Sequence, residues 1–104
     1  MPSASSTLEL TLPASVLTFC RKHDLVTHLD FAQQLVSRLF EPVRSLRLTL
    51  EPDPETGEEA VVIDVSTDLS PSEALSRKRE YTRRWVEAVP PAVIGTIRLV
   101  LDIA

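Results

Sequence analysis

Apolar and polar residues alternate in three stretches of the chain, and a period of two predicts β-strands. In each stretch every second residue is Leu, Val or Ile, so one face of each strand should point into a core. The three stretches are RSLRLTLE at residues 44–51, AVVIDVS at residues 60–66 and GTIRLVLDI at residues 95–103. A fourth alternating run, TLELTL at residues 7–12, either adds a strand or leads into the helix that follows.

Elsewhere apolar residues recur at spacings of three and four, as on one face of an α-helix. For the second helix we expect Thr27 as N-cap, Asp30 completing a capping box, and Val26 in contact with Phe31 as a hydrophobic staple. The helices predicted by this spacing cover residues 13–24, 27–40 and 69–89.

The third predicted helix has the clearest boundaries. Ser70, Pro71 and Glu73 have the spacing of N-cap, N1 and N3 in a capping box. Pro90 and Pro91 should end the helix, because the residue before a proline is pushed out of the α region.

The order helix, helix, strand, strand, helix, strand predicts an α+β domain. We expect a mainly antiparallel sheet of three strands, or four with residues 7–12, with the helices on its apolar face. A right-handed crossover through the third helix would let the last strand pair antiparallel beside the first, giving the order 2-1-3. We expect residues 1–6 to be a disordered tail and residues 7–104 to form one domain.

Composition narrows the classes of function. The chain of 104 residues has a net charge of −4, whereas non-specific nucleic-acid binding usually needs a basic surface. Its apolar runs are too short to span a bilayer, and its single cysteine allows no intrachain disulfide, which favours the cytoplasm. Its two glycines, Gly57 and Gly95, stand apart, so no glycine-rich phosphate loop can form.

The acidic stretch EPDPETGEEA, residues 51–60, raises the question of a cation site. An EF-hand-like reading would begin at Glu51, Asp53 and Glu55, but the glycine then falls one place late, at Gly57. The twelfth position would be Val62 where a bidentate Glu is needed. The stretch is therefore interpreted as a solvated hairpin loop, and no metal is expected there.

A basic cluster, RKREYTRR at residues 77–84, lies on the third predicted helix. Glu80 and Glu87 lie between its basic residues on the outer face of the helix, and the pairs Glu80–Arg84 and Arg83–Glu87 have i,i+4 spacing. We interpret it as a solvated, ion-paired face. Trp85, on the apolar arc, should be buried in the core.

Two further groups resemble sites. Cys20 and His23 are three residues apart on a helix, which suits a nucleophile–base pair or two metal ligands, but a buried structural cysteine explains Cys20 better. The polar face of the strands offers either a converging polar site or cross-strand ion pairs. The residues on that face are Arg47, Val62, Asp64, Arg98, Val100 and Asp102.

The runs EPDPETGEE, VVIDV, RRWVEAVP and IRLVLDI together resemble a group of small uncharacterised bacterial proteins. These share an acidic hairpin, a helix ending W-x-x-x-V-P and a closing alternating strand. The resemblance covers residues 46–103 and contains no catalytic signature. It implies an accessory or antitoxin-like member of a two-gene pair, although this chain has no basic DNA-binding arm.

We therefore expect a non-catalytic protein-interaction module that binds another protein or itself, without cofactor, metal, nucleic acid or membrane. Opposite charges on the acidic loop and the basic helix would orient association. The alternative is a small enzyme or ligand-binding protein that uses Arg47, Asp64 and Arg98 on the polar sheet face. The expected partner contacts are Glu55, Glu58, Glu59, Arg79, Arg83 and Arg84.

Overall fold

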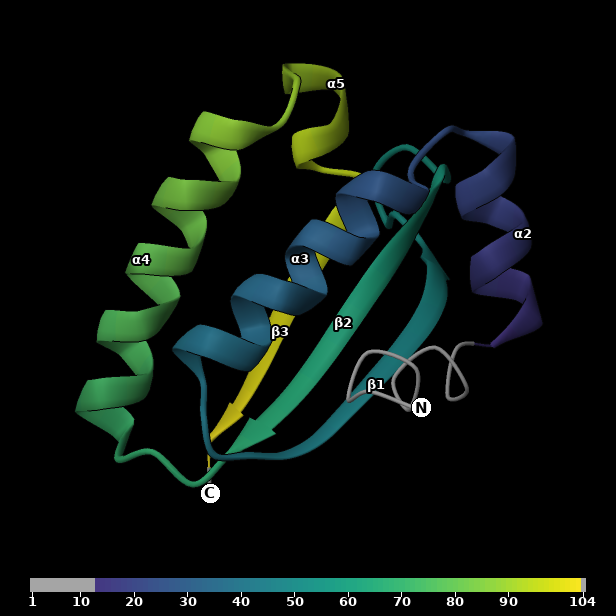
Figure 1. Ribbon diagram of the computed structural model, residues 1–104. Helices are drawn as coiled ribbons and strands as arrows, with labels where there is room; N and C mark the ends of the chain where they lie inside the picture. Colours follow the sequence, from purple (N-terminus) through teal and green to yellow (C-terminus); the bar gives the residue numbers. More distant parts are fainter. Residues whose placement is uncertain (1–12, 104) are drawn as a thin grey trace, which may run out of the picture.

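The computed structural model describes residues 13–103, so the predicted tail and the alternating run at residues 7–12 lie outside the described residues. The elements are α2 (Ala14–Lys22), α3 (Val26–Leu39), β1 (Val43–Pro52), β2 (Glu59–Thr67), α4 (Pro71–Ala88), α5 (Pro91–Ile94) and β3 (Ile97–Ile103). Figure 1 shows α3 lying across the sheet, α4 on the side of β3 and α2 on the side of β1. The predicted α+β class and element order are confirmed, and the short α5 is an addition.

The sheet differs from the prediction in the position of β3. The strand order is β1-β2-β3, with β1 and β2 antiparallel and β2 and β3 parallel. The predicted order 2-1-3 and its mainly antiparallel pairing are therefore wrong, because the sheet is mixed. The direction of β3 is the same in the predicted and the observed sheet. The prediction is wrong in placing β3 beside β1 instead of β2.

The helices explain why β3 lies beside β2. An 18-residue α4 returns the chain to the start of β2, and consecutive elements usually lie next to one another. The helical layer over β1 is already occupied, since α2 contacts β1. By contrast, α4 contacts β3. With β3 beside β2, the apolar face of β3 is available for α4 to pack against.

The predicted hairpin is confirmed, with Leu48 opposite Ile63 in the antiparallel register. The connecting loop is residues 53–58 and closes with two backbone hydrogen bonds, from Asp53 N to Glu58 O at 2.7 Å and from Gly57 N to Asp53 O at 2.8 Å. Gly57 has a φ of 76°, which suits a residue without a Cβ. The acidic stretch is thus built as a tight turn.

The turn between α2 and α3 corrects the predicted capping of α3. The helix begins at Val26 after Leu25, without a side-chain cap, so the capping box on Thr27 and Asp30 is wrong. Asp24 instead adopts a φ of 58°, and the N–H of Leu25 reaches the carbonyl of Cys20 at 2.7 Å. This is a Schellman arrangement, which lets α3 start directly after α2.

The boundaries of α4 match the sequence prediction. Ser70 is the N-cap, with its Oγ accepting from the N–H of Glu73 at 3.3 Å, and Pro71 is the first helical residue. The hydroxyl of Ser70 also donates to the Glu73 carboxylate at 3.0 Å. In the usual capping box this carboxylate accepts from the backbone N–H of the N-cap residue, so here the hydroxyl replaces that donor. The helix ends at Ala88, ahead of Pro90.

The core lies between the sheet and the helices. Trp85 is buried, as predicted, and its ring stacks between those of Phe31 and Tyr81, each at 6.2 Å between centroids. Its indole N–H donates to the carbonyl of Ile94 at 3.2 Å, which anchors α5 to α4. The largest fully buried side chains include Phe40, Ile63, Ile97, Val16, Val36, Val61 and Val65.

Candidate functional site

One face of the sheet is left uncovered by the described helices and carries the polar residues that the sequence singled out. Strand alternation sends Val61, Ile63 and Val65 into the core, so their neighbours in β2 point the other way. The registers with β1 and β3 place the other residues of this open face beside them. The face consists of Ser45, Arg47, Thr49, Glu51, Ala60, Val62, Asp64, Ser66, Arg98, Val100 and Asp102.

The three residues of the predicted polar site do not converge. Arg47 lies opposite Asp64 in the register, but none of the ion pairs between described residues joins them. Arg98 turns toward the hairpin loop and pairs with Asp53, and its Nε donates to the carbonyl of Gly95 at 3.0 Å. The enzyme alternative requires Arg98 close to Asp64, but Arg98 holds the hairpin loop instead.

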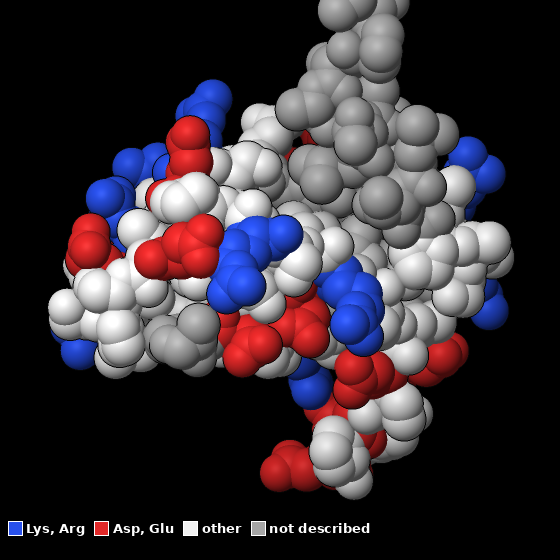
Figure 2. Space-filling model, turned by 90° about the horizontal axis from the view of Figure 1, so that it is seen from below, with Lys and Arg blue, Asp and Glu red and all other residues white. Residues whose placement is uncertain are grey.

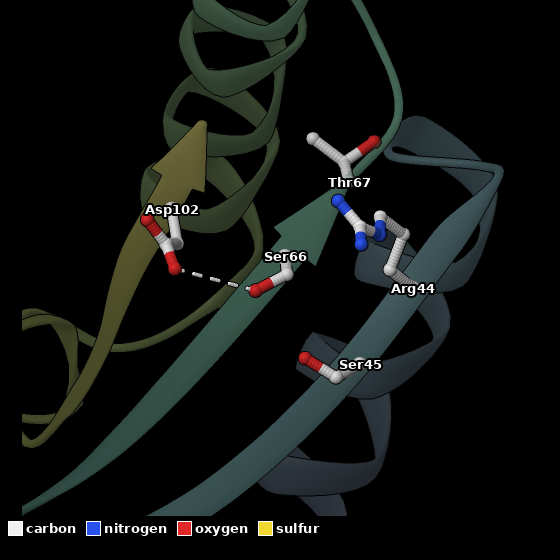
Figure 3. Close-up of a pocket in the computed structure, with 5 residues that line it drawn as sticks. All are labelled: Arg44, Ser45, Ser66, Thr67 and Asp102. Atoms are coloured by element: carbon white, nitrogen blue, oxygen red, sulfur yellow. Dashed lines mark hydrogen bonds between the residues drawn. The ribbon is translucent and has the colours of Figure 1, made fainter. Parts of the chain in front are cut away.

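A shallow hollow of about 330 Å³ opens at the carboxyl ends of β2 and β3. Figure 3 shows the guanidinium of Arg44 leaning from β1 toward β2, with Ser66 and Asp102 facing one another. Ser66 donates to Asp102 at 3.5 Å, and Arg44 pairs with Asp68 at 3.4 Å. These polar groups already have partners within the chain.

Thr67, at the edge of this hollow, is a structural residue that the sequence reasoning missed. Its buried hydroxyl donates to the carbonyl of Phe40 at 2.8 Å and accepts from the N–H of Leu69 at 3.2 Å. The hydroxyl thus ties the end of α3 to the end of β2. No sequence signal distinguishes this threonine from a solvated one, because the carbonyl that accepts its proton belongs to Phe40, which is distant along the chain.

The acidic loop presents three of the expected partner contacts. Glu55, Glu58 and Glu59 are exposed, whereas Asp53 is turned inward against Arg98. The hydrogen bond from Arg98 above all lowers the pKa of Asp53 below its ordinary value, helped by the N–H groups of Glu55 and Thr56. Across residues 13–103, no group of three or more His, Cys, Asp and Glu side chains is arranged to hold a metal ion.

The other expected contacts lie on α4. Arg83 and Arg84 both donate to the carboxylate of Glu80, at 2.5 and 2.6 Å, and Arg83 also reaches Glu87 at 3.2 Å. The bonds from Arg83 and then Arg84 lower the pKa of Glu80 to about 2. Arg79 is exposed. Figure 2 shows acidic and basic side chains intermixed on the end of the molecule that it presents, without a broad surface of one sign.

The structure does not assemble the cysteine–histidine pair. Cys20 is fully buried, and burial raises the pKa of its thiol, which disfavours the nucleophilic thiolate. His23 is exposed, with its ring 4.4 Å from that of Phe19. A neighbouring hollow of about 280 Å³ between α2 and α3 is mainly apolar. Gln33 is among its lining residues, and the side-chain nitrogen of Gln33 is buried without a hydrogen-bond partner.

Among the described residues, the exposed large apolar side chains lie on β3, α4 and the start of α3, where Val26 is 46% exposed. Val100 is 48% exposed on the open face, and on α4 Leu75 is 50% and Val86 48% exposed. Within residues 13–103, β3 pairs with a strand on one side only, so its other edge is open. Alternation in the sequence identified Val100 as outward-facing, but the open edge follows from the strand order.

Comparisons with known proteins give no indication of function. No family model matches the chain, and no similar curated protein or solved structure was found. None of the helices in the described part of the chain is both long and apolar enough to cross a membrane.

Proposed function

We propose that this protein is a non-catalytic protein-interaction module whose contact surface is centred on β3. The observation that carries the proposal is the open edge of β3 next to the half-exposed Val100. An unpaired strand edge presents backbone N–H and C=O groups to another chain. Apolar side chains beside it supply the contact area that such an association needs.

The charges around this surface would guide the partner's approach. Glu55, Glu58 and Glu59 on the loop and Arg79, Arg83 and Arg84 on α4 are exposed and of opposite sign. Exposed charges mainly speed and orient association and are screened by salt. The internal pairing of Arg83 and Arg84 with Glu80 reduces the net positive charge that α4 offers. The single buried thiol of Cys20 suits a reducing compartment such as the cytoplasm.

The partner is either a second copy of the chain or a different protein, such as the product of an adjacent gene. Sedimentation velocity over a range of concentrations detects self-association. Cross-linking in the native host, followed by purification of the complex, detects a different protein as partner. We expect Val100→Lys to weaken the association that is found. Val26→Lys is the matched control, because Val26 is similarly exposed, at 46%, on α3.

The enzyme alternative makes a different prediction. A chain that remains monomeric, binds no protein and turns over a substrate would contradict the proposal. Loss of that turnover in Arg47→Ala and Asp64→Asn, with the fold retained, would place the activity on the open sheet face.

A further inference from the structure

The sequence of β3 is complementary to itself. Residues 97–103 read Ile-Arg-Leu-Val-Leu-Asp-Ile, which is the same in both directions except that Arg98 is mirrored by Asp102. We propose that β3 pairs antiparallel with β3 of a second copy of this chain, with Val100 at the two-fold axis. This proposal rests on the proposed function, because it names the partner that the β3 surface binds.

An antiparallel pairing centred on Val100 matches every residue of the strand with a suitable opposite. Residues directly opposite one another in antiparallel strands point to the same face of the sheet. Arg98 would lie opposite the partner's Asp102, and Asp102 opposite the partner's Arg98. Leu99 would lie opposite the partner's Leu101 on the helix-covered face. Because a two-fold interface repeats each contact, one favourable ion pair gives two.

The alternative directions and registers are less favourable. A parallel pairing in register would place Arg98 next to the partner's Arg98 and Asp102 next to the partner's Asp102. Like charges in adjacent strands destabilise a sheet. An antiparallel shift of one residue would bring the helix-covered face of one copy onto the open face of the other. The charges therefore select the antiparallel direction, and the match of the two faces excludes a shift by one residue.

The edge of β3 carries two charged side chains, Arg98 and Asp102, but it has no proline, lysine or bulge to keep other chains away. The opposite edge differs, since β1 has an irregularity between Val43 and Ser45 and ends at Pro52. Among the described strands, β3 is thus the edge suited to receive another strand.

Both charged residues of β3 have hydrogen-bonding capacity that their internal contacts do not use. Arg98 uses Nη2 for Asp53 and Nε for the carbonyl of Gly95, and a guanidinium has five N–H donors in all. Asp102 is exposed and accepts a long hydrogen bond of 3.5 Å from Ser66. Its carboxylate therefore has acceptor capacity for the partner's Arg98.

The exposed apolar residues of α4 extend the same surface. Arg77 and Arg84 line a hollow together with Leu39 of α3, so that flank of α4 faces α3. At about 100° per residue, Leu75 and Val86 fall on the opposite flank, away from α3. In Figure 1, α4 lies on the β3 side of the molecule. A two-fold axis perpendicular to the sheet would bring these flanks of the two α4 helices toward one another.

Charge reversal tests the pairing directly. Arg98→Asp and Asp102→Arg should each raise the dimer dissociation constant by at least about tenfold, because each creates two like-charge contacts. An equimolar mixture of the two variants should recover a dimer, since each copy then supplies the charge that the other lacks. The double variant R98D/D102R should dimerise alone. Thermal melts of each variant check that the monomer remains folded.

Engineered cysteines test the register. Opposite residues in an antiparallel pair have Cα atoms about 4.5–5.5 Å apart, which is within the range of a disulfide. Val100→Cys should therefore form a covalent dimer on mild oxidation. Arg98→Cys and Asp102→Cys should cross-link when mixed and not separately. Arg47→Cys, in β1 on the same open face, is the control and should remain uncross-linked.

The outcomes separate this inference from the proposed function. A dimer that survives Arg98→Asp and does not cross-link through Val100→Cys would overturn the β3 pairing while retaining an interaction module. So would a monomer that binds a different protein in a manner sensitive to Val100→Lys. A Val100→Cys variant that remains monomeric and forms no covalent dimer on oxidation would also overturn the inference.

Discussion

The carboxylate of Asp53, in the loop between β1 and β2, accepts a hydrogen bond from the guanidinium of Arg98 in β3, 45 residues later in the chain. Its other oxygen accepts from the N–H groups of Glu55, at 2.7 Å, and Thr56, at 3.2 Å. One acidic residue thus folds the loop and ties it to the edge strand. This use of Asp53 gives a structural role to one acid of the stretch that resembled a cation site in the sequence.

The pKa of Asp53 should respond to this pairing. Because its folded pKa is lowered, first by Arg98, the stabilisation is present above the unfolded pKa and is lost as the pH falls through the folded one. Arg98→Ala should move the pKa of Asp53 back toward its ordinary value, as followed by carboxyl NMR. Arg47→Ala is the control and should leave that pKa unchanged. An unaltered Asp53 titration in Arg98→Ala would contradict the pairing.

Trp85 should contribute strongly to stability, since it is 4% exposed and lies between two aromatic rings. Trp85→Ala should lower the free energy of unfolding by about 3–5 kcal/mol, because it leaves a large cavity. Trp85→Phe should cost less, since it keeps a ring and loses the bond to the carbonyl of Ile94. Urea denaturation followed by circular dichroism measures both. Equal stability of Trp85→Ala and the parent chain would refute this role.

Tyr81 gives the opposite expectation. Its hydroxyl is buried without a hydrogen-bond partner, and burial raises its pKa well above the ordinary value for tyrosine. Tyr81→Phe should therefore be neutral or raise the free energy of unfolding by up to about 1 kcal/mol, because it removes an unsatisfied polar group. Tyr81→Ala, which also removes the ring, should cost about 3–5 kcal/mol. A marked loss of stability in Tyr81→Phe would show that the hydroxyl does have a partner.

Substitution of Asp24 by glycine should increase the stability of the fold. It has a φ of 58°, a left-handed conformation that glycine adopts without steric cost. Asp24→Gly should raise the free energy of unfolding by up to about 1 kcal/mol, whereas Asp24→Ala should lower it. Asp24→Asn separates the causes, because it removes the negative charge near the end of α2 and keeps a side chain. Differential scanning calorimetry of the three variants ranks their stabilities. Equal stabilities of Asp24→Gly and Asp24→Ala would contradict this prediction.

The local features of the fold could be predicted where neighbouring residues carry the information. The alternation of residues 44–51 and 60–66, joined by a loop with proline and glycine, determined the hairpin. Ser70, Pro71 and Glu73 determined the start of α4, because a helix cap depends on residues within one turn. The capping of α3 was predicted wrongly. The left-handed turn before α3 is made by Asp24, and the sequence has no glycine at that position to indicate such a turn.

Tertiary structure decided where β3 lies and therefore which surface remains open. Alternation fixes which face of a strand is apolar, but it does not fix the neighbour of that strand. That choice depends on how α2, α3 and α4 divide the apolar face of the sheet among them. The charges illustrate the same division: the sequence placed Arg98 on the polar face, and only the folded chain brought it to Asp53. The near-symmetry of residues 97–103 is present in the sequence, but only the strand order shows that β3 is an edge strand of the sheet formed by residues 13–103.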